Sequence, residues 1–390
     1  MKNDLSNKIE KIRSKYLKLF KVKPILIESP GRVNLIGEHT DYNDGYVLPA
    51  AIDKKIILAI EKSDDDICTF YSFDLAEKIS FKISEIEKRS KEWANYLLGV
   101  IDQLKKRNKR ISAFNCVFGG NIPIGSGLSS SAAIEGGLIF ALNYLFKLKL
   151  KPIEMVKIAQ AAENEFVGVR CGIMDQYVNI FGLKKKVMQI DCRDLSYNYL
   201  PFEDDALRFV LCNSMVKHSL ASSEYNIRRI QCEEGINIIS RKFKKVESLR
   251  DVNMKMLESC AESMNPIIFK RCKYVIEENR RVKFACDALK KNDFRFLGKL
   301  MSESHQGLNE LYEVSCNELN YLVAVAEKFE GVFGSRMMGG GFGGCTINLV
   351  EADYVSEFSE KIVSEFFGKF DVKPEIYVCG IERGTNIINL

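Results

Sequence analysis

Hydrophobic and polar positions along the 390-residue chain change their period several times, and these changes predict a fold of mixed helices and strands. Residues 4–21 and 92–106 repeat apolar positions at helical spacing. Residues 24–29 and 46–60 are rich in β-branched residues and predict strands, with a turn near Asp53 and Lys54. Further short apolar runs predict a hairpin over 66–84 and strands over 114–118, 187–191 and 207–213.

Residues 152–167 have the pattern of an amphipathic helix. Its apolar stripe consists of Met155, Ile158 or Ala159, Ala162 and Phe166. Glu163 lies beside this stripe, so its carboxylate should point toward the interior and should need a polar partner there.

The second half of the chain returns to strands only near its end. The polar segment 198–205 contains Pro201 and is the best candidate for a domain boundary. It would divide an amino-terminal domain, residues 1–203, from a carboxy-terminal domain, residues 204–390. Within the latter, residues 219–330 are mostly helical in pattern, and strands are expected over 331–338, 345–350 and 375–379, with a helix over 355–367.

The composition limits which kinds of molecule the protein is expected to bind and where in the cell it is expected to be. The formal net charge is +5, from 57 basic and 52 acidic residues, and the basic runs are short. Such runs favour solvated faces over nucleic acid or membrane binding. No run of about 18 apolar residues is present, and the amino-terminal residues do not resemble a signal peptide. The 12 cysteines are widely spaced, which is typical of a cytoplasmic protein with free thiols.

A glycine- and serine-rich loop, residues 119–131, follows the strand predicted over 114–118 and precedes a buried helical pattern over 132–146. Glycines allow close approach of the backbone to a ligand, and the first turn of a helix favours an anion. The loop therefore predicts a phosphate site, and a helix cap with a flexible lead-in is the alternative. It is not a Walker A loop, because no lysine lies between Gly119 and Lys147.

A second segment, residues 30–49, gathers Arg32, Glu38, His39, Asp41 and Asn43 between two predicted strands. These side chains can bond several hydroxyls at once, which suits a sugar or another polyol. Arg32 could neutralise a transferring phosphoryl group. A polar turn is the alternative, but a turn seldom needs Glu, His, Asp and Arg together.

Three motifs carry a resemblance to a known family. Gly31 to Pro49 resembles the galactokinase signature nearly residue for residue, and Pro123 to Ala133 is similar to the ATP-binding loop of the GHMP kinases. Gly334 to Cys345 resembles the third motif of that superfamily. The motifs occur in the family's order and cover the chain from about residue 20 to its end.

The resemblance implies an α+β fold of two lobes. The amino-terminal lobe would resemble the second domain of ribosomal protein S5, the carboxy-terminal lobe would be ferredoxin-like, and the active site would lie between them. The implied activity is ATP-dependent phosphorylation of α-D-galactose at its anomeric hydroxyl, the entry step of the Leloir pathway of galactose metabolism. The alternatives are another sugar 1-kinase, for N-acetylgalactosamine or L-arabinose, and a non-catalytic galactose sensor. A monomer is expected.

The resemblance also assigns roles to residues. Sugar binding is implied for Arg32, Glu38, His39, Thr40, Asp41, Gly172, Asp175 and Tyr225. ATP binding is implied for Gly125, Ser126, Gly127, Leu128, Ser129, Ser130 and Ser131, and on the adenine side for Ser72 and Trp93, although a core position is the alternative for Trp93. Ser131 and Glu163 would hold Mg²⁺, since hydroxyl and carboxylate oxygens suit that ion.

Two of these residues would act in catalysis. Asp175 would accept the proton of the anomeric hydroxyl as that oxygen attacks the γ-phosphorus of ATP. Arg32 would keep Asp175 ionised and, with Mg²⁺, would stabilise the transferring group. Whether Asp175 acts as a base or mainly orients the hydroxyl is left open by the sequence.

Overall fold

The computed structural model describes residues 2–123, 125–202, 206–216 and 221–389. Its α-helices are α1 (Lys2–Phe20), α2 (Glu92–Lys106), α3 (Ser130–Leu145), α4 (Pro152–Ala161), α5 (Met174–Phe181), α6 (Ala221–Lys242), α7 (Met254–Glu258), α8 (Pro266–Lys290), α9 (Phe294–Glu310), α10 (Asn317–Ala326) and α11 (Val355–Phe370). A π-helical turn, Ala162–Val167, continues α4.

The strands form three sheets. They are β1 (Ile25–Asn34), β2 (Tyr46–Val47), β3 (Pro49–Lys62), β4 (Ile67–Ser72), β5 (Glu77–Lys82), β6 (Phe114–Gly120), β7 (Lys186–Asp191), β8 (Tyr197–Pro201), β9 (Leu207–Asn213), β10 (Val332–Met337), β11 (Cys345–Glu351), β12 (Glu375–Cys379) and β13 (Asn386–Ile387). The sheet orders are β13-β1-β3-β6-β4-β5, β10-β11-β9-β12 and β2-β7-β8. Only the pairing of β4 with β6 is parallel among the described strand pairs.

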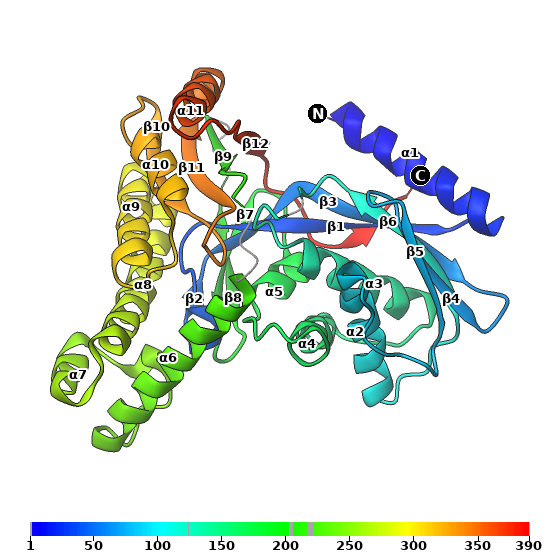
Figure 1. Cartoon of the computed structure of the whole chain (residues 1–390), viewed down its shortest axis with the longest axis horizontal. Coiled ribbons are helices and arrows are strands. Elements are labelled where there is room, and N and C mark those ends of the chain that lie inside the picture. Colours follow the sequence, from blue (N-terminus) through cyan, green and yellow to red (C-terminus); the bar gives the residue numbers. More distant parts are fainter. Residues whose placement is uncertain (1, 124, 203–205, 217–220, 390) are drawn as a thin grey trace.

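The six-stranded sheet is covered on both faces, because neighbouring residues of its strands point to opposite sides. Leu26 and Ile57 face α1, where they pack with Ile12 and Tyr16. The next residues along each strand, Ile27 and Leu58, belong to the main core with α3. Figure 1 shows α1 on one face of this sheet and α2 to α5 on the other. The sheet therefore holds α3 and α5 in fixed positions relative to β1.

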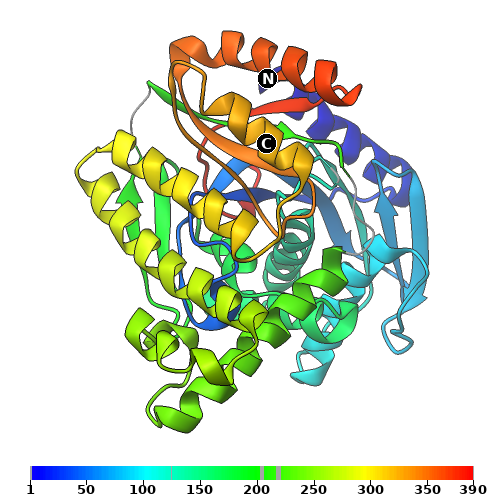
Figure 2. The same cartoon turned by 60° about the vertical axis from the view of Figure 1, so that its left-hand side comes forward.

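The four-stranded sheet also has two apolar faces. Val210 of β9 packs with Phe358 and Ile362 of α11. Leu211, one residue later, belongs to the main core, which includes Leu297 and Met301 of α9. Helices α8 and α9 form an antiparallel pair beside this sheet (Figures 1 and 2). The resulting core is continuous with that of the six-stranded sheet.

The domain boundary expected at residues 203 and 204 stays a prediction. Residues 203–205 lie outside the described part of the chain. The polar segment expected to form the boundary contains strand β8, which pairs with β7. The main core also includes Phe202 and Phe209, whose rings stack with centroids 4.7 Å apart. The two halves of the chain are therefore packed together around one core.

Most predicted elements are present, and the errors have tertiary causes. The turn expected near Asp53 and Lys54 is wrong, because β3 runs unbroken through both residues between β1 and β6. The next residue, Lys55, is buried and forms an ion pair of 2.9 Å with Glu28 on β1. The strand expected to end at residue 29 continues through Gly31, with a register shift between Pro30 and Arg32. Cross-strand partners thus outweigh local propensity.

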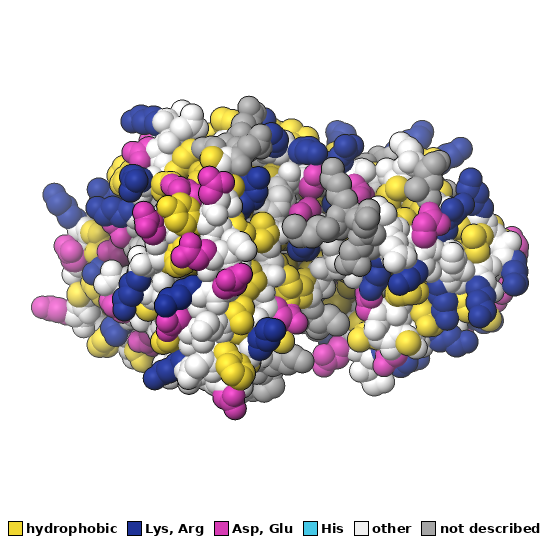
Figure 3. Space-filling model, turned by 90° about the horizontal axis from the view of Figure 1, so that it is seen from above, with side chains coloured by type: hydrophobic (Ala, Val, Ile, Leu, Met, Phe, Trp, Pro, Cys, Tyr) yellow, Lys and Arg dark blue, Asp and Glu magenta, His cyan; other side chains and the backbone are white. Residues whose placement is uncertain are grey.

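Charged side chains of both signs share the face of the molecule seen in Figure 3. Figure 3 shows Lys and Arg side chains interspersed with Asp and Glu over the face in view. Among the described helices, none combines the length and the apolar character that crossing a membrane requires.

Candidate active site

Two neighbouring cavities contain most of the predicted site residues. The first, here called the loop cavity, has a volume of about 430 Å³ and is lined by the glycine- and serine-rich loop. The second, the carboxylate cavity, measures about 230 Å³ and is lined by Asp41, Glu163 and Asp175. Arg32 and Gly340 line both, so the two cavities meet at these residues.

The loop cavity contains every residue predicted to bind ATP. Gly125 to Ser131 form one wall, and Ser72 on β4 and Trp93 on α2 form another. Trp93 also packs against Phe118, at 5.4 Å between ring centroids, and its indole nitrogen donates to Glu77 over 2.8 Å. Trp93 therefore lines the cavity and also packs against the core, and its role in ATP binding stays a prediction.

The loop is shaped by a few unusual backbone conformations. Gly127 has a φ of +73°, which side-chain-bearing residues rarely adopt. Ser129 occupies the N-cap position of α3 at φ 58° but makes no capping bond to the helix. Its hydroxyl donates instead to Asp175. The first turn of α3 therefore has no side-chain cap, and its residues Ser130 and Ser131 line the cavity, as an anion site at a helix N-terminus requires.

Arg32 and Asp175 form a bidentate ion pair where the two cavities meet. Nε of Arg32 donates to Oδ1 over 2.9 Å, and Nη2 donates to Oδ2 over 3.1 Å. Nη1 donates to the carbonyl of Gly127, which ties the pair to the loop. Burial alone would lower the pKa of Arg32, but the charges of Asp175 and Glu38 outweigh it and raise that pKa. Arg32 thus remains a fixed cation beside Asp175.

Asp41 and Gly172 lie in contact with each other on the wall of the carboxylate cavity. Burial, reinforced by the charge of Asp175, raises the pKa of Asp41 to about 7. A Cβ atom added to Gly172 would lie 1.8 Å from Oδ2 of Asp41. Only glycine therefore fits at position 172 while Asp41 keeps this position.

Glu38 is held in the carboxylate cavity by groups from the third motif. Its Oε1 accepts from Nη2 of Arg336 over 3.0 Å and from the backbone N–H of Gly339 over 2.9 Å. Arg336 is fully buried and also donates to the carbonyls of Leu35 and Met337. Arg336 was missed as a functional residue, although it lies within the third motif.

The rings of His39 and Tyr225, tilted against each other, complete this cavity. Their ring centroids are 5.1 Å apart. Burial lowers the pKa of His39 to about 3, so its imidazole is neutral at physiological pH. Thr40 is the one predicted sugar residue that does not line the cavity. Its hydroxyl donates to the carbonyls of Gly37 and Tyr46, over 2.8 and 2.7 Å, and so shapes the loop.

Glu163 lies in the π-helical turn and is buried, as its position beside the apolar stripe predicts. Burial and the charge of Asp175 raise its pKa to about 7, and the nearby Ser131 hydroxyl favours its ionised form. Nε2 of Gln176 donates to Glu163 over 2.8 Å and to Glu135 over 3.2 Å. Glu135 and Gln176 were not predicted, because a buried polar pair on two apolar helices leaves no clear sequence pattern.

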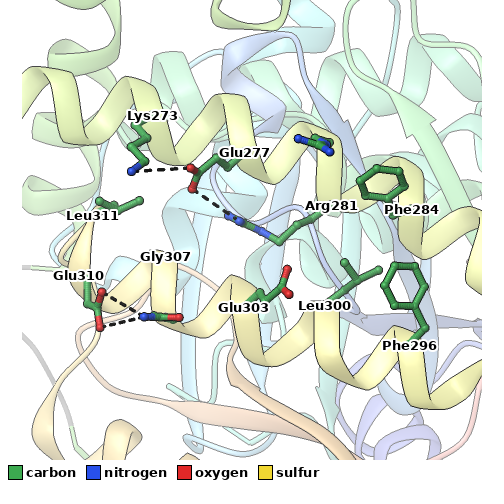
Figure 4. Close-up of a pocket in the computed structure, with 12 residues that line it drawn as sticks. Lys273, Glu277, Arg281, Phe284, Phe296, Leu300, Glu303, Gly307, Glu310 and Leu311 are labelled. Carbon is green, nitrogen blue, oxygen red and sulfur yellow. Dashed lines mark hydrogen bonds and ion pairs between the residues drawn. The ribbon is translucent and has the colours of Figure 1, made fainter. Parts of the chain in front are cut away.

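A larger cavity of about 580 Å³ lies between α8 and α9 and contains none of the predicted residues. Figure 4 shows that its charged side chains bond one another. Glu277 forms ion pairs with Lys273, at 3.9 Å, and with Arg281, at 3.7 Å. Size alone therefore does not mark the candidate site.

Comparisons with known proteins agree with this geometry. The galactokinase galactose-binding signature matches residues 14–62, the GHMP kinase N-terminal domain matches 95–183, and the GHMP kinase C-terminal model matches 285–369. The chain is 42% identical over 346 residues to a galactokinase of Thermotoga maritima, covering 89% of this chain and 95% of that protein. It is also 42% identical to a galactokinase of Clostridium acetobutylicum, covering 93% and 94%.

Solved structures give the same result. The crystal structure of Lactococcus lactis galactokinase complexed with galactose superimposes with a TM-score of 0.93 at 34% identity, covering 97% of this chain and 99% of that one. Methanococcus jannaschii mevalonate kinase shares the fold, with a TM-score of 0.65 at 21% identity. The two-lobed GHMP kinase fold expected from the motifs is confirmed, and the chain belongs to the galactokinase family of the GHMP kinases.

Proposed function

We propose that this protein transfers the γ-phosphoryl group of ATP to the anomeric hydroxyl of α-D-galactose, giving galactose 1-phosphate and ADP. The observation that carries the proposal is the Arg32–Asp175 pair at the meeting point of a loop cavity and a carboxylate cavity. A phosphoryl donor in the first and a polyol in the second would meet at this pair. Family membership selects galactose as the polyol.

The residues divide the chemistry between them. Asp175 would accept the proton of the anomeric hydroxyl, and the Ser129 hydroxyl and Arg32 hold its carboxylate in place. Arg32 would then stabilise the negative charge on the transferring group. Glu38, His39, Asp41 and Tyr225 would bond the remaining sugar hydroxyls, and the first turn of α3 would bind the phosphates.

Ser131 and Glu163 fit a Mg²⁺ ion. In the described part of the chain, neither Glu163 nor Glu135 makes an ion pair, and Oε1 of Glu135 is buried without a hydrogen-bond partner. Both carboxyl groups accept from Gln176 and lie near Ser131 of the loop expected to hold phosphates, where a bound cation would stabilise their ionised forms. Among described residues, no group of three or more His, Cys, Asp or Glu could hold a metal by itself, which suits an ion that keeps water and phosphate ligands. When bound, Mg²⁺ supplies charge neutralisation for the phosphates.

The proposal also covers the cellular location and the oligomeric state of the protein. All 12 cysteines are free, and they all lie in the described part of the chain. Free thiols favour a reducing compartment, so we place the protein in the cytoplasm. A monomer is proposed, and its mass in solution is the measurement that tests this.

A coupled ADP-release assay with galactose, N-acetylgalactosamine, L-arabinose and glucose tests the proposed reaction. We expect galactose to give the highest kcat/KM. A higher value for N-acetylgalactosamine or arabinose would identify another sugar 1-kinase. Galactose binding with no ADP released from any sugar would identify a sensor.

A further inference from the structure

A chain of hydroxyl groups runs from His39 away from the carboxylate cavity. Nδ1 of His39 lies 2.8 Å from the hydroxyl of Tyr42, and that hydroxyl lies 2.8 Å from the hydroxyl of Tyr312. The Tyr312 hydroxyl in turn lies 3.2 Å from the sulfur of Cys232. Tyr42 comes from the galactokinase signature, whereas Tyr312 follows α9, so the tertiary fold alone brings them together.

The other nitrogen of the same ring, Nε2, is buried. His39 is 3% exposed and lines the carboxylate cavity. Its Nε2 has no well-formed hydrogen bond in the described part of the chain. The rings of Tyr225 and Tyr312 flank the imidazole, with centroids 5.1 and 4.9 Å away. His39 therefore lines the cavity with one nitrogen bonded to Tyr42 and one buried nitrogen that has no well-formed hydrogen bond to the described residues.

The acceptor strengths of these hydrogen-bonded groups decide which nitrogen of His39 carries the single imidazole proton. A neutral imidazole nitrogen is a stronger acceptor than a phenol oxygen, and a thiol sulfur is a weak acceptor. The favoured order therefore has Tyr312 donating to Tyr42 and Tyr42 donating to Nδ1 of His39. The proton of His39 is then on Nε2, and the nearby backbone of Gly340 favours a proton on the ring.

We propose that Tyr42 and Tyr312 are positioning residues that hold His39 in its Nε2–H form, so that His39 donates a hydrogen bond to an oxygen of the bound sugar. This inference rests on the proposed function for the identity of the ligand. It adds a specificity role to two tyrosines whose hydroxyls lie outside the direct sugar contacts. Losing either hydroxyl would free the ring to adopt the other tautomer, which presents an acceptor where a donor is needed.

The tautomer can be measured directly in the protein without substrate. The chain has three histidines, so long-range ¹H–¹⁵N correlation spectra of ¹⁵N-histidine-labelled protein are simple, and His39→Gln identifies the His39 signals. We expect wild-type His39 to show the Nε2–H pattern at pH 6 and at pH 9. Tyr42→Phe should give a mixture of tautomers, and Tyr312→Phe a smaller change. An Nδ1–H pattern in the wild type would overturn the proposal.

Kinetics give the second readout. Tyr42→Phe should raise KM for galactose roughly tenfold, with KM for ATP and kcat within about twofold, because only a ground-state sugar contact is lost. Tyr199→Phe is the matched control, since its hydroxyl donates to the backbone of Phe181 away from both cavities. An unchanged tautomer together with an unchanged KM in Tyr42→Phe would overturn the proposal. A failed ADP-release assay would overturn the proposed reaction alone, because the tautomer is read without sugar.

Discussion

The loop cavity and the carboxylate cavity are neighbours, but they are built in different ways. One continuous segment, Gly125 to Ser131, forms most of the wall that would face the phosphates. The carboxylate cavity instead draws on residues near 40, 170, 225 and 340. The first cavity depends on local backbone geometry, and the second depends on side chains that hold one another across the fold. We therefore expect substitutions in the carboxylate cavity to be tolerated less well. They should also weaken sugar binding more than ATP binding.

The largest effect is expected where the two cavities meet. Asp175→Asn should leave the fold intact and lower kcat by at least about 10³-fold, since the proton acceptor is removed. Single-turnover phosphoryl transfer and a thermal melt measure the two properties. Glu303→Gln, the same chemical change in the cavity between α8 and α9, should leave kcat within about twofold. Substantial kcat in folded Asp175→Asn would contradict the general-base role.

Gly172→Ala should show the largest difference between its effects on sugar binding and on ATP binding. The added Cβ would overlap the Asp41 carboxylate, so the wall of the carboxylate cavity must shift. We expect KM for galactose to rise roughly 10- to 100-fold, with ATP binding nearly unchanged. Calorimetric titration with each substrate measures this. Gly368→Ala is the control, because a Cβ there meets no atom within 4 Å. Equal losses of sugar and ATP affinity would mean that the cavities are not independent.

Ser131→Ala should have the opposite selectivity and a smaller effect. Removing the hydroxyl beside Glu163 should weaken binding of Mg·ATP roughly tenfold and spare galactose affinity. Titration of Mg²⁺ in the presence of ADP gives a readout that does not need turnover. Lost sugar binding with intact Mg·ADP binding would contradict the assignment of Ser131 to the Mg·ATP site.

The last expected effect is on stability and its dependence on pH rather than on substrate binding. The folded-state pKa of Asp41 is about 7, above its ordinary value of 3.8. The folded protein therefore gains stability from protonated Asp41 at low pH and loses it as pH rises through 7. Asp41→Asn cannot ionise, so its stability relative to wild type should increase between pH 5 and pH 8.5 by up to about 3 kcal/mol, mostly below pH 7. Urea unfolding without ligands measures this, and parallel pH profiles would contradict it.

Local sequence predicted the loop cavity well. The change from strand to helix, the glycines and the run of serines all act within about 15 residues, where backbone conformation and the helix terminus decide the outcome. The same local reasoning misassigned Asp53 and Lys54 to a turn. There β3 stays extended because Ile52 forms a bridge with Ile381 and the backbone N–H of Asp53 donates to the carbonyl of Gly380, far away in the sequence.

The carboxylate cavity was predictable only in part. The signature motif identified Glu38, His39 and Asp41 by residue type. It gave no indication that Arg336 anchors Glu38, or that Tyr312 lies behind His39. These partners are about 300 and 270 residues distant in the sequence, and only the packing of the two halves around one core brings them into contact.

The sequence by itself determined the family, the order of the motifs and the residue types that the chemistry needs. Tertiary structure alone decided which cavity each residue lines, that Thr40 shapes the loop rather than the cavity, and that Arg32 and Asp175 meet between the two cavities. The physical reason is that local patterns fix backbone conformation over a few turns. Burial, charge pairing and hydrogen-bond partners instead depend on residues that only the folded core brings together.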